Sequence, residues 1–116
     1  MKKTTADILP GTLDMLILKA VSLSPLHGYA VLLRIRQISH DALDIPQGSL
    51  YPALYRLEQQ DLISAEWGES DNGRRAKFYT LTPAGRKRLR DETASWNRLT
   101  TAIAAAMNAT TDDLEA

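Results

Sequence analysis

The chain has 116 residues, of which 44% are hydrophobic and 24% are charged, with a formal net charge of zero and no cysteine. These values are typical of one globular domain, and they exclude disulfides, a thiolate nucleophile and a thiolate metal site. The apolar runs are too short to cross a bilayer, and none follows the basic start in the manner of a signal peptide. We therefore expect a cytoplasmic protein without a membrane partner.

A net charge of zero argues against a nucleic-acid partner, but the charges are segregated along the sequence. Between Arg74 and Arg90 there are seven basic residues and no acidic one, whereas acidic residues gather just before and just after this stretch. One face of the folded chain should therefore be positive, as in proteins that bind phosphates of nucleic acids.

The first half of the chain predicts two helices. We expect residues 1–10 to form a flexible arm. Apolar residues at helical spacing then predict a helix over about 12–23, which ends where Pro25 cannot continue it, and a second helix over about 28–39.

A third helix is expected to begin near Gln47 to Ser49. If Ser49 is its cap, Pro52 lies in the first turn, where a missing N–H group has little effect. The helix should end near Gln60, with Asp61 in the left-handed conformation that commonly closes a helix.

The second half of the chain predicts a hairpin and a long helix. Residues 62–67 and 77–81 are rich in β-forming residues and flank a turn containing Asn72-Gly73. Thr82 should cap a last helix, with Pro83 at its first position, that continues to about residue 108.

These elements predict a mainly α fold with a small β-hairpin, namely a winged helix-turn-helix followed by a long C-terminal dimerisation helix. We divide the chain into a DNA-binding domain over 1–81, the dimerisation helix over 82–108 and a flexible tail over 109–116. The expected core consists of apolar residues from every element: Leu16, Ile17, Leu32, Ile35, Leu50, Leu54, Leu57, Ile63 and Leu81. Trp67 is expected to pack the hairpin against this core.

The third helix has the pattern of a DNA recognition helix. Its exposed face is aromatic and basic, and a basic hairpin follows it directly, as in a winged helix. The candidate DNA-binding residues are Tyr29, Gln47, Ser49, Tyr51, Pro52, Tyr55, Arg56, Arg74, Arg75 and Lys77. Alternatively, the tyrosines are packing residues, and the basic residues of the hairpin only lie in a solvated turn.

An apolar stripe with heptad-like spacing runs along the last helix and indicates a twofold partner. The candidate dimer-interface residues are Met15, Leu18, Leu89, Trp96, Leu99, Ile103, Ala106 and Met107. Met15 and Leu18 are included because they lie off the core stripe of the first helix. Trp96 is either dimer packing or, with Met15 and Leu99, part of a cleft for a small aromatic effector.

The sequence resembles the PadR family of bacterial transcriptional regulators. The matching pieces are Leu9-Pro10-Gly11-Thr12-Leu13, His27-Gly28-Tyr29, Gln47 to Leu54, Arg56-Leu57-Glu58, Ala65-Glu66-Trp67, Arg74 to Tyr79 and Leu81-Thr82-x-x-Gly85. The resemblance implies a dimeric winged helix-turn-helix of the short type, usually a repressor, that often responds to small aromatic molecules. Asp61 departs from the pattern, since glycine is common there and Asp adopts the left-handed conformation less readily.

Three classes of function were weighed. A homodimeric repressor that binds a palindromic operator in double-stranded DNA fits best, and a winged-helix module that binds protein instead of DNA is the alternative. We reject an enzyme because the sequence has no nucleophile–base set, phosphate loop or metal cluster. No cofactor, metal or catalytic residue is expected, and His27 should be a turn histidine with a local hydrogen bond.

Overall fold

The computed structural model describes residues 11–114, and the expected arm over residues 1–10 lies outside them. The elements are α1 (Thr12–Leu23), β1 (Leu26–His27), α2 (Gly28–Ile38), α3 (Gln47–Gln59), β2 (Ile63–Glu69), β3 (Arg75–Leu81), α4 (Pro83–Met107) and a 3-10 helix (Thr111–Leu114). The mainly α class with a small β-hairpin is confirmed. The 3-10 helix lies in the segment that we expected to be a flexible tail.

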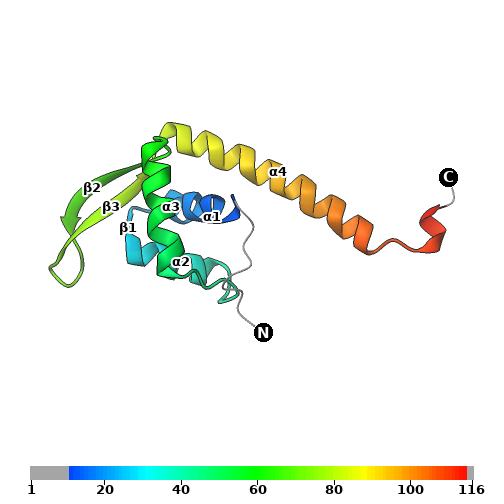
Figure 1. Cartoon of the computed structure of the whole chain (residues 1–116), viewed down its shortest axis with the longest axis horizontal. Coiled ribbons are helices and arrows are strands. Elements are labelled where there is room, and N and C mark those ends of the chain that lie inside the picture. Colours follow the sequence, from blue (N-terminus) through cyan, green and yellow to red (C-terminus); the bar gives the residue numbers. More distant parts are fainter. Residues whose placement is uncertain (1–10, 115–116) are drawn as a thin grey trace.

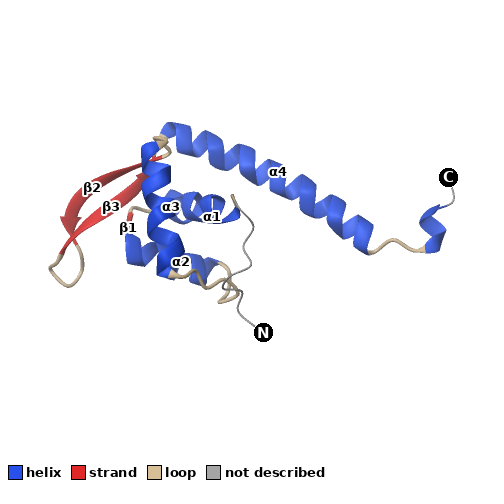
Figure 2. Ribbon diagram, in the orientation of Figure 1, coloured by secondary structure: helices blue, strands red, loops and turns tan. Residues whose placement is uncertain are grey.

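Three helices form the body of the fold, and two elements project from it (Figures 1 and 2). α1, α2 and α3 pack on one another, and the β2–β3 hairpin and the free part of α4 extend in opposite directions. The radius of gyration is 17.1 Å, whereas a compact chain of about 100 residues has roughly 13 Å. α4 therefore leaves much of its length outside the body.

Side chains from all three body helices and from the sheet form the core. Six of the nine predicted core residues are fully buried, and the other three, Leu16, Leu32 and Leu81, are half-buried at its edge. Leu18 is also buried, at 1% exposure, which corrects our expectation that it lies off the core stripe. Because α1 contacts α2, α3, β3 and α4, it buries more than one face.

The sheet has three strands, where we predicted a two-stranded hairpin. The strand order is β1-β3-β2, and β3 pairs antiparallel with both neighbours. β1 has only two residues, Leu26 and His27, which we expected to be an irregular break after α1. The short strand ties the start of α2 to the base of the hairpin through Tyr79 and Phe78.

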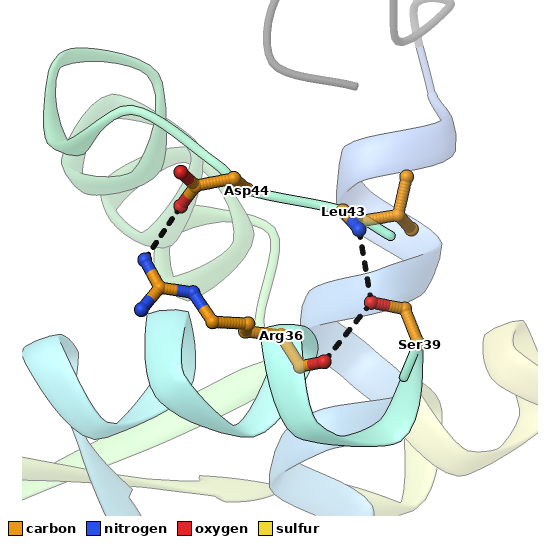
Figure 3. Close-up of polar contacts among 4 residues, drawn as sticks. All are labelled: Arg36, Ser39, Leu43 and Asp44. Carbon is orange, nitrogen blue, oxygen red and sulfur yellow. Dashed lines mark hydrogen bonds and ion pairs between the residues drawn. The ribbon is translucent and has the colours of Figure 1, made fainter. Parts of the chain in front are cut away.

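The connection between α2 and α3 is a hydrogen-bonded turn (Figure 3). The Ser39 hydroxyl donates to the Arg36 carbonyl oxygen and accepts from the Leu43 amide at 3.1 Å. The Arg36 guanidinium also reaches Asp44, with Nη2 and Oδ1 2.7 Å apart. These contacts span the turn, and Ile45, which follows it just before α3, is buried.

α3 begins three residues earlier than a Ser49 cap would allow. Pro46 is the capping residue, and its carbonyl oxygen accepts from the amides of Ser49 and Leu50 at 3.0 and 3.1 Å. Pro52 consequently lies inside the helix and not in its first turn. The end was predicted correctly, because Asp61 is left-handed, with a φ of 60°.

The start of α4 is held against the α3–β2 junction. The Thr82 hydroxyl accepts from the Gly85 amide at 3.0 Å, which confirms the predicted cap, and donates to the Asp61 carbonyl oxygen at 2.7 Å. A Cβ atom on Gly85 would overlap the Leu62 carbonyl oxygen. Glycine is therefore required where α4 passes the backbone of the winged domain.

Candidate nucleic-acid interface

α3 presents an aromatic and basic face to solvent. Leu50, Leu54 and Leu57 are buried, which leaves the opposite side of the helix outermost. Tyr51 and Tyr55 are 46% and 57% exposed. The other predicted contacts on this helix, Gln47, Ser49, Pro52 and Arg56, are exposed too. Tyr29 of α2 is 49% exposed.

The Tyr51 ring lies against the first residue of α2. A Cβ atom on Gly28 would be 2.6 Å from Cε1 of Tyr51, closer than carbon atoms can approach. The space that Gly28 leaves open thus determines where the tyrosine ring lies. Sequence reasoning found both residues in separate motifs but not this contact between them.

Arg56 is engaged within the chain. Its Nη2 atom lies 2.6 Å from Oδ1 of Asp14 in α1, in a surface ion pair whose side chains are 50% and 25% exposed. Exposed pairs contribute about 0–1 kcal/mol, so a DNA phosphate can compete for the guanidinium. The predicted phosphate contact therefore requires Arg56 to leave Asp14.

The hairpin turn displays Arg74 at its tip. The Ser70 amide donates to the Arg74 carbonyl oxygen at 2.8 Å, and the Asn72 side chain accepts from both the Arg74 amide and the Ser70 hydroxyl. The turn is therefore ordered by its own hydrogen bonds. The Arg74 side chain is exposed and has no ion pair among the described residues.

Lys77 connects the hairpin to α3. Its Nζ donates to Oε1 of Glu58 at 3.1 Å and lies 5.8 Å from the centre of the Tyr79 ring. The hydrogen bond to Glu58 raises the pKa of Lys77, and burial raises the pKa of Tyr79. Lys77 therefore fixes the hairpin relative to α3, a role that its place in a basic run did not indicate.

Trp67 does not pack against the core, contrary to our expectation. The ring is 60% exposed, and the Arg75 guanidinium carbon lies over it, 5.1 Å from its centre. Trp67 pairs with Lys77 across the hairpin, so both lie on the face that reaches α3. Alternation of side chains along β2 from the buried Ile63 predicts which face of the hairpin carries Trp67. The ring is exposed because Trp67 lies beyond the end of the core.

The predicted dimer residues fall into two groups. Trp96, Leu99, Ile103 and Met107 form an exposed apolar stripe on α4, from 38% to 77% exposed, and Ala106 is exposed beside it. In contrast, Leu18 is buried within the chain and is removed from the predicted dimer surface. Leu89 and Met15 are half-buried, and Leu89 packs against the core of its own chain.

Met15 and Trp96 both line each of two hollows beside α1 and α4. One, of about 240 Å³, also includes Leu99 and Glu92, so the three predicted ligand residues do lie together. The other, of about 640 Å³, is lined by Lys19 and Arg90 as well as by apolar side chains. The two hollows differ in charge, since the first has a carboxylate and the second has two cations.

His27 has a structural role at the start of α2. Its Nδ1 atom accepts from the Ala30 amide at 3.4 Å, and its ring meets Phe78 edge to face, with the ring centres 5.7 Å apart. This confirms a local hydrogen bond for the histidine.

Within residues 11–114, no helix is both long enough and apolar enough to span a membrane.

Comparison with known proteins identifies similar chains. Residues 17–91 match the transcriptional regulator PadR-like family. An uncharacterized protein of Lysinibacillus sphaericus is 29% identical over 91 residues, which are 78% of this chain and 84% of that protein.

Solved structures show the same fold. A PadR family transcriptional regulator of Eggerthella lenta has a TM-score of 0.72 and 30% identity, and the match covers 86% of this chain and 85% of that one. A PadR-like transcriptional regulator of Bacillus cereus has a TM-score of 0.77 and 25% identity, and the match covers 90% of this chain and all of that one.

Proposed function

The chain belongs to the PadR-like family of transcriptional regulators, and from this premise we propose that it is a cytoplasmic homodimer that binds a palindromic operator and represses transcription. One observation supports this proposal above all others. The exposed face of α3 carries tyrosines and Arg56, and the hairpin tied to this helix carries Arg74 and Arg75. Base edges and phosphates are the groups that such a surface binds.

The two kinds of contact divide between the two elements. Gln47 and Ser49, at the start of α3, meet base edges in the major groove, because the first residues of a recognition helix enter the groove most deeply. Arg74 and Arg75, on the hairpin, meet the backbone phosphates. The proposal thus makes α3 responsible for sequence specificity and the hairpin for most of the salt-dependent affinity.

A second copy of the chain covers the apolar stripe of α4. The stripe begins beside the start of α1, where Trp96 and Leu99 line a hollow with Met15, and continues to Met107 at the end of α4. Its large side chains are left exposed by the single chain. A contiguous exposed apolar surface is a protein-interaction site. Twofold pairing along this stripe gives two recognition helices, and these match half-sites about 34 Å apart, one turn of the duplex.

A small aromatic effector regulates this dimer by binding at Trp96. Flat rings stack on tryptophan, and the hollow that contains Met15, Trp96 and Leu99 also contains Glu92, which favours a cation. The ligand changes DNA affinity only if it prefers one separation of the two winged domains, because equal affinity for both states shifts no equilibrium.

The test is fluorescence anisotropy with labelled duplex DNA at several salt concentrations. Arg74→Ala combined with Arg75→Ala should weaken binding to every duplex and make the affinity less salt-dependent. The matched control is Arg88→Ala combined with Arg98→Ala, which removes the same charge from α4 and should keep the salt dependence. Unchanged operator binding by the hairpin variant at moderate salt would overturn the assignment of the hairpin.

The alternative is a winged-helix module that binds a protein. A folded dimer that binds no duplex, even at low salt, would favour it. The exposed basic hairpin speaks against this alternative, because a protein-binding module has no need for phosphate contacts.

A further inference from the structure

Trp67 is an exposed aromatic residue that takes part in neither the proposed DNA contacts nor the proposed dimer interface. It lies on β2, away from the apolar stripe of α4, and the hairpin and the free part of α4 project in opposite directions (Figure 1). The dimer contact proposed above therefore leaves the ring uncovered. At 60% exposure, the ring does not contribute much to the core either.

The partner of Trp67 within the chain is the guanidinium of Arg75. The guanidinium carbon lies 5.1 Å from the centre of the indole ring, within the range of a cation–π contact. Glu69 lies directly opposite Arg75 in the strand register, but no ion pair joins the two in the described part of the chain. The guanidinium therefore lies over the ring, and no described residue forms an ion pair with it.

Contact with the ring lowers the side-chain entropy that Arg75 loses when it binds a ligand. A free arginine has many rotamers and loses side-chain entropy when it binds, whereas a planar guanidinium lying on a ring is already oriented. Arg75 is in this respect different from its neighbour Arg74, which has no cation–π contact within residues 11–114. Of the two hairpin arginines, only Arg75 is held in one direction.

The Arg75 side chain lies on the face of the hairpin that contacts α3, the proposed recognition helix. Arg75, Lys77 and Tyr79 alternate along β3 and lie on one face of the hairpin, and Lys77 on that face bonds to Glu58 of α3. Arg75 is the first residue of β3 and lies nearer the hairpin turn than Lys77 does. If α3 lies in the major groove, the turn end of the hairpin is the part of the chain that would reach the neighbouring groove beside the half-site.

We propose that Trp67 is a positioning residue that holds Arg75 for insertion into the minor groove beside each half-site, so that the protein prefers A·T-rich flanks. This inference rests on the proposed DNA binding and refines one part of it: the Arg75 guanidinium lies in the groove between the backbone phosphates, where it adds a second source of specificity. Narrow minor grooves of A·T-rich DNA have enhanced negative potential and attract arginine, whereas the guanine 2-amino group blocks the groove floor. Arg75 thereby reads groove shape, while α3 reads bases.

The experiment uses a duplex selected for binding from a random pool, with only its flanking base pairs altered. Three versions carry A·T, G·C or inosine·cytosine pairs in the flanks. Inosine lacks the 2-amino group of guanine, so it is like adenine in the minor groove while it keeps the major-groove carbonyl of guanine. The full-length protein should bind the A·T and inosine versions more tightly than the G·C version.

Variants test the role of the ring. Trp67→Ala and Arg75→Lys should each lose roughly two- to fivefold of the flank preference, which is the strength of an exposed cation–π contact. Trp67→Phe should keep part of the preference, because a ring remains. Glu69→Gln is the matched control on the same hairpin and should keep all of it.

The outcomes separate this inference from the function on which it rests. If no duplex binds, the proposed function fails and this inference fails with it. If duplexes bind but the flanks have no effect, or if inosine behaves as guanine, the minor-groove reading is wrong. If Trp67→Ala is folded by circular dichroism and keeps the full flank preference, Trp67 does not position Arg75.

Discussion

Arg56 of α3 and Asp14 of α1 form an ion pair, with Nη2 and Oδ1 2.6 Å apart, that joins the proposed DNA-reading helix to the helix behind it. Asp14 immediately precedes Met15, which lines both hollows at the α1–α4 junction. The DNA face and the proposed effector site are thus connected through one short helix. A ligand that moves α1 would also move the partner of Arg56.

Asp14→Asn should increase DNA affinity by up to about fivefold, because the variant removes the carboxylate that competes with phosphates for Arg56. The measurement is anisotropy at fixed salt. Asp91→Asn is the control, since it breaks the exposed Lys87–Asp91 pair on α4 with the same change in charge. An equal gain in both variants would mean that only net charge matters.

Gly28→Ala should reduce DNA affinity without unfolding the protein, because the added Cβ atom must push the Tyr51 ring out of its place. The loss should be about 1 kcal/mol, the strength of one hydrogen bond, and should match that of Tyr51→Ala. The double variant should lose no more than either single variant, since both act on one contact. Additive losses would show that Gly28 does not act through Tyr51.

Gly85→Ala should destabilise the fold by about 1–3 kcal/mol, because the new methyl group overlaps the Leu62 carbonyl oxygen where α4 begins. Urea unfolding measures the change. Gly48→Ala is the same substitution at a helical glycine with open space around it. It should be neutral or stabilising by up to about 1 kcal/mol. Equal stability of the two variants would contradict the close approach at Gly85.

Ile103→Lys should convert the proposed dimer into monomers or aggregates, because it places a charge in the middle of the apolar stripe. Thr101→Lys adds the same charge to an exposed α4 residue off the stripe and should leave the dimer intact. Sedimentation equilibrium distinguishes the two results. An unaltered dimer in the Ile103 variant would overturn the proposed interface.

The fluorescence of Trp96 should be quenched by flat aromatic cations. In Trp67→Phe, Trp96 is the only tryptophan left, since the sequence has two. Stacking adds roughly 0.5–1.5 kcal/mol per ring pair, which is compatible with micromolar binding once area burial is included. Glu92→Gln should weaken the binding of a cationic dye more than that of a neutral dye. If no dye quenches at micromolar concentration, Trp96 serves only for packing.

The sequence predicted those parts of the fold that local pattern determines. The leucines at 50, 54 and 57 are buried as their spacing indicated, and the Thr82 cap and the left-handed Asp61 occur where their residue types predicted them. In each of these cases the structure depends on neighbours a few residues away. Such features are visible in one sequence.

Features that depend on distant neighbours were missed. β1 is too short to show a strand pattern and exists only because β3 lies beside it. Our prediction for Leu18 was wrong because the sequence does not show how many elements surround α1. Our prediction for Trp67 was wrong because the sequence does not show where the core ends. The contacts of Asp14, Gly28 and Glu58 with the candidate DNA face are equally non-local.

The most direct test of the account is selection of bound fragments from random duplex DNA by the full-length protein, followed by sequencing. The account predicts a palindromic consensus whose half-sites are centred about one turn of the duplex apart, because two recognition helices related by a twofold axis read it. A consensus without twofold symmetry, or no enrichment of any sequence, would contradict the proposal that this chain is a homodimeric, sequence-specific DNA-binding regulator.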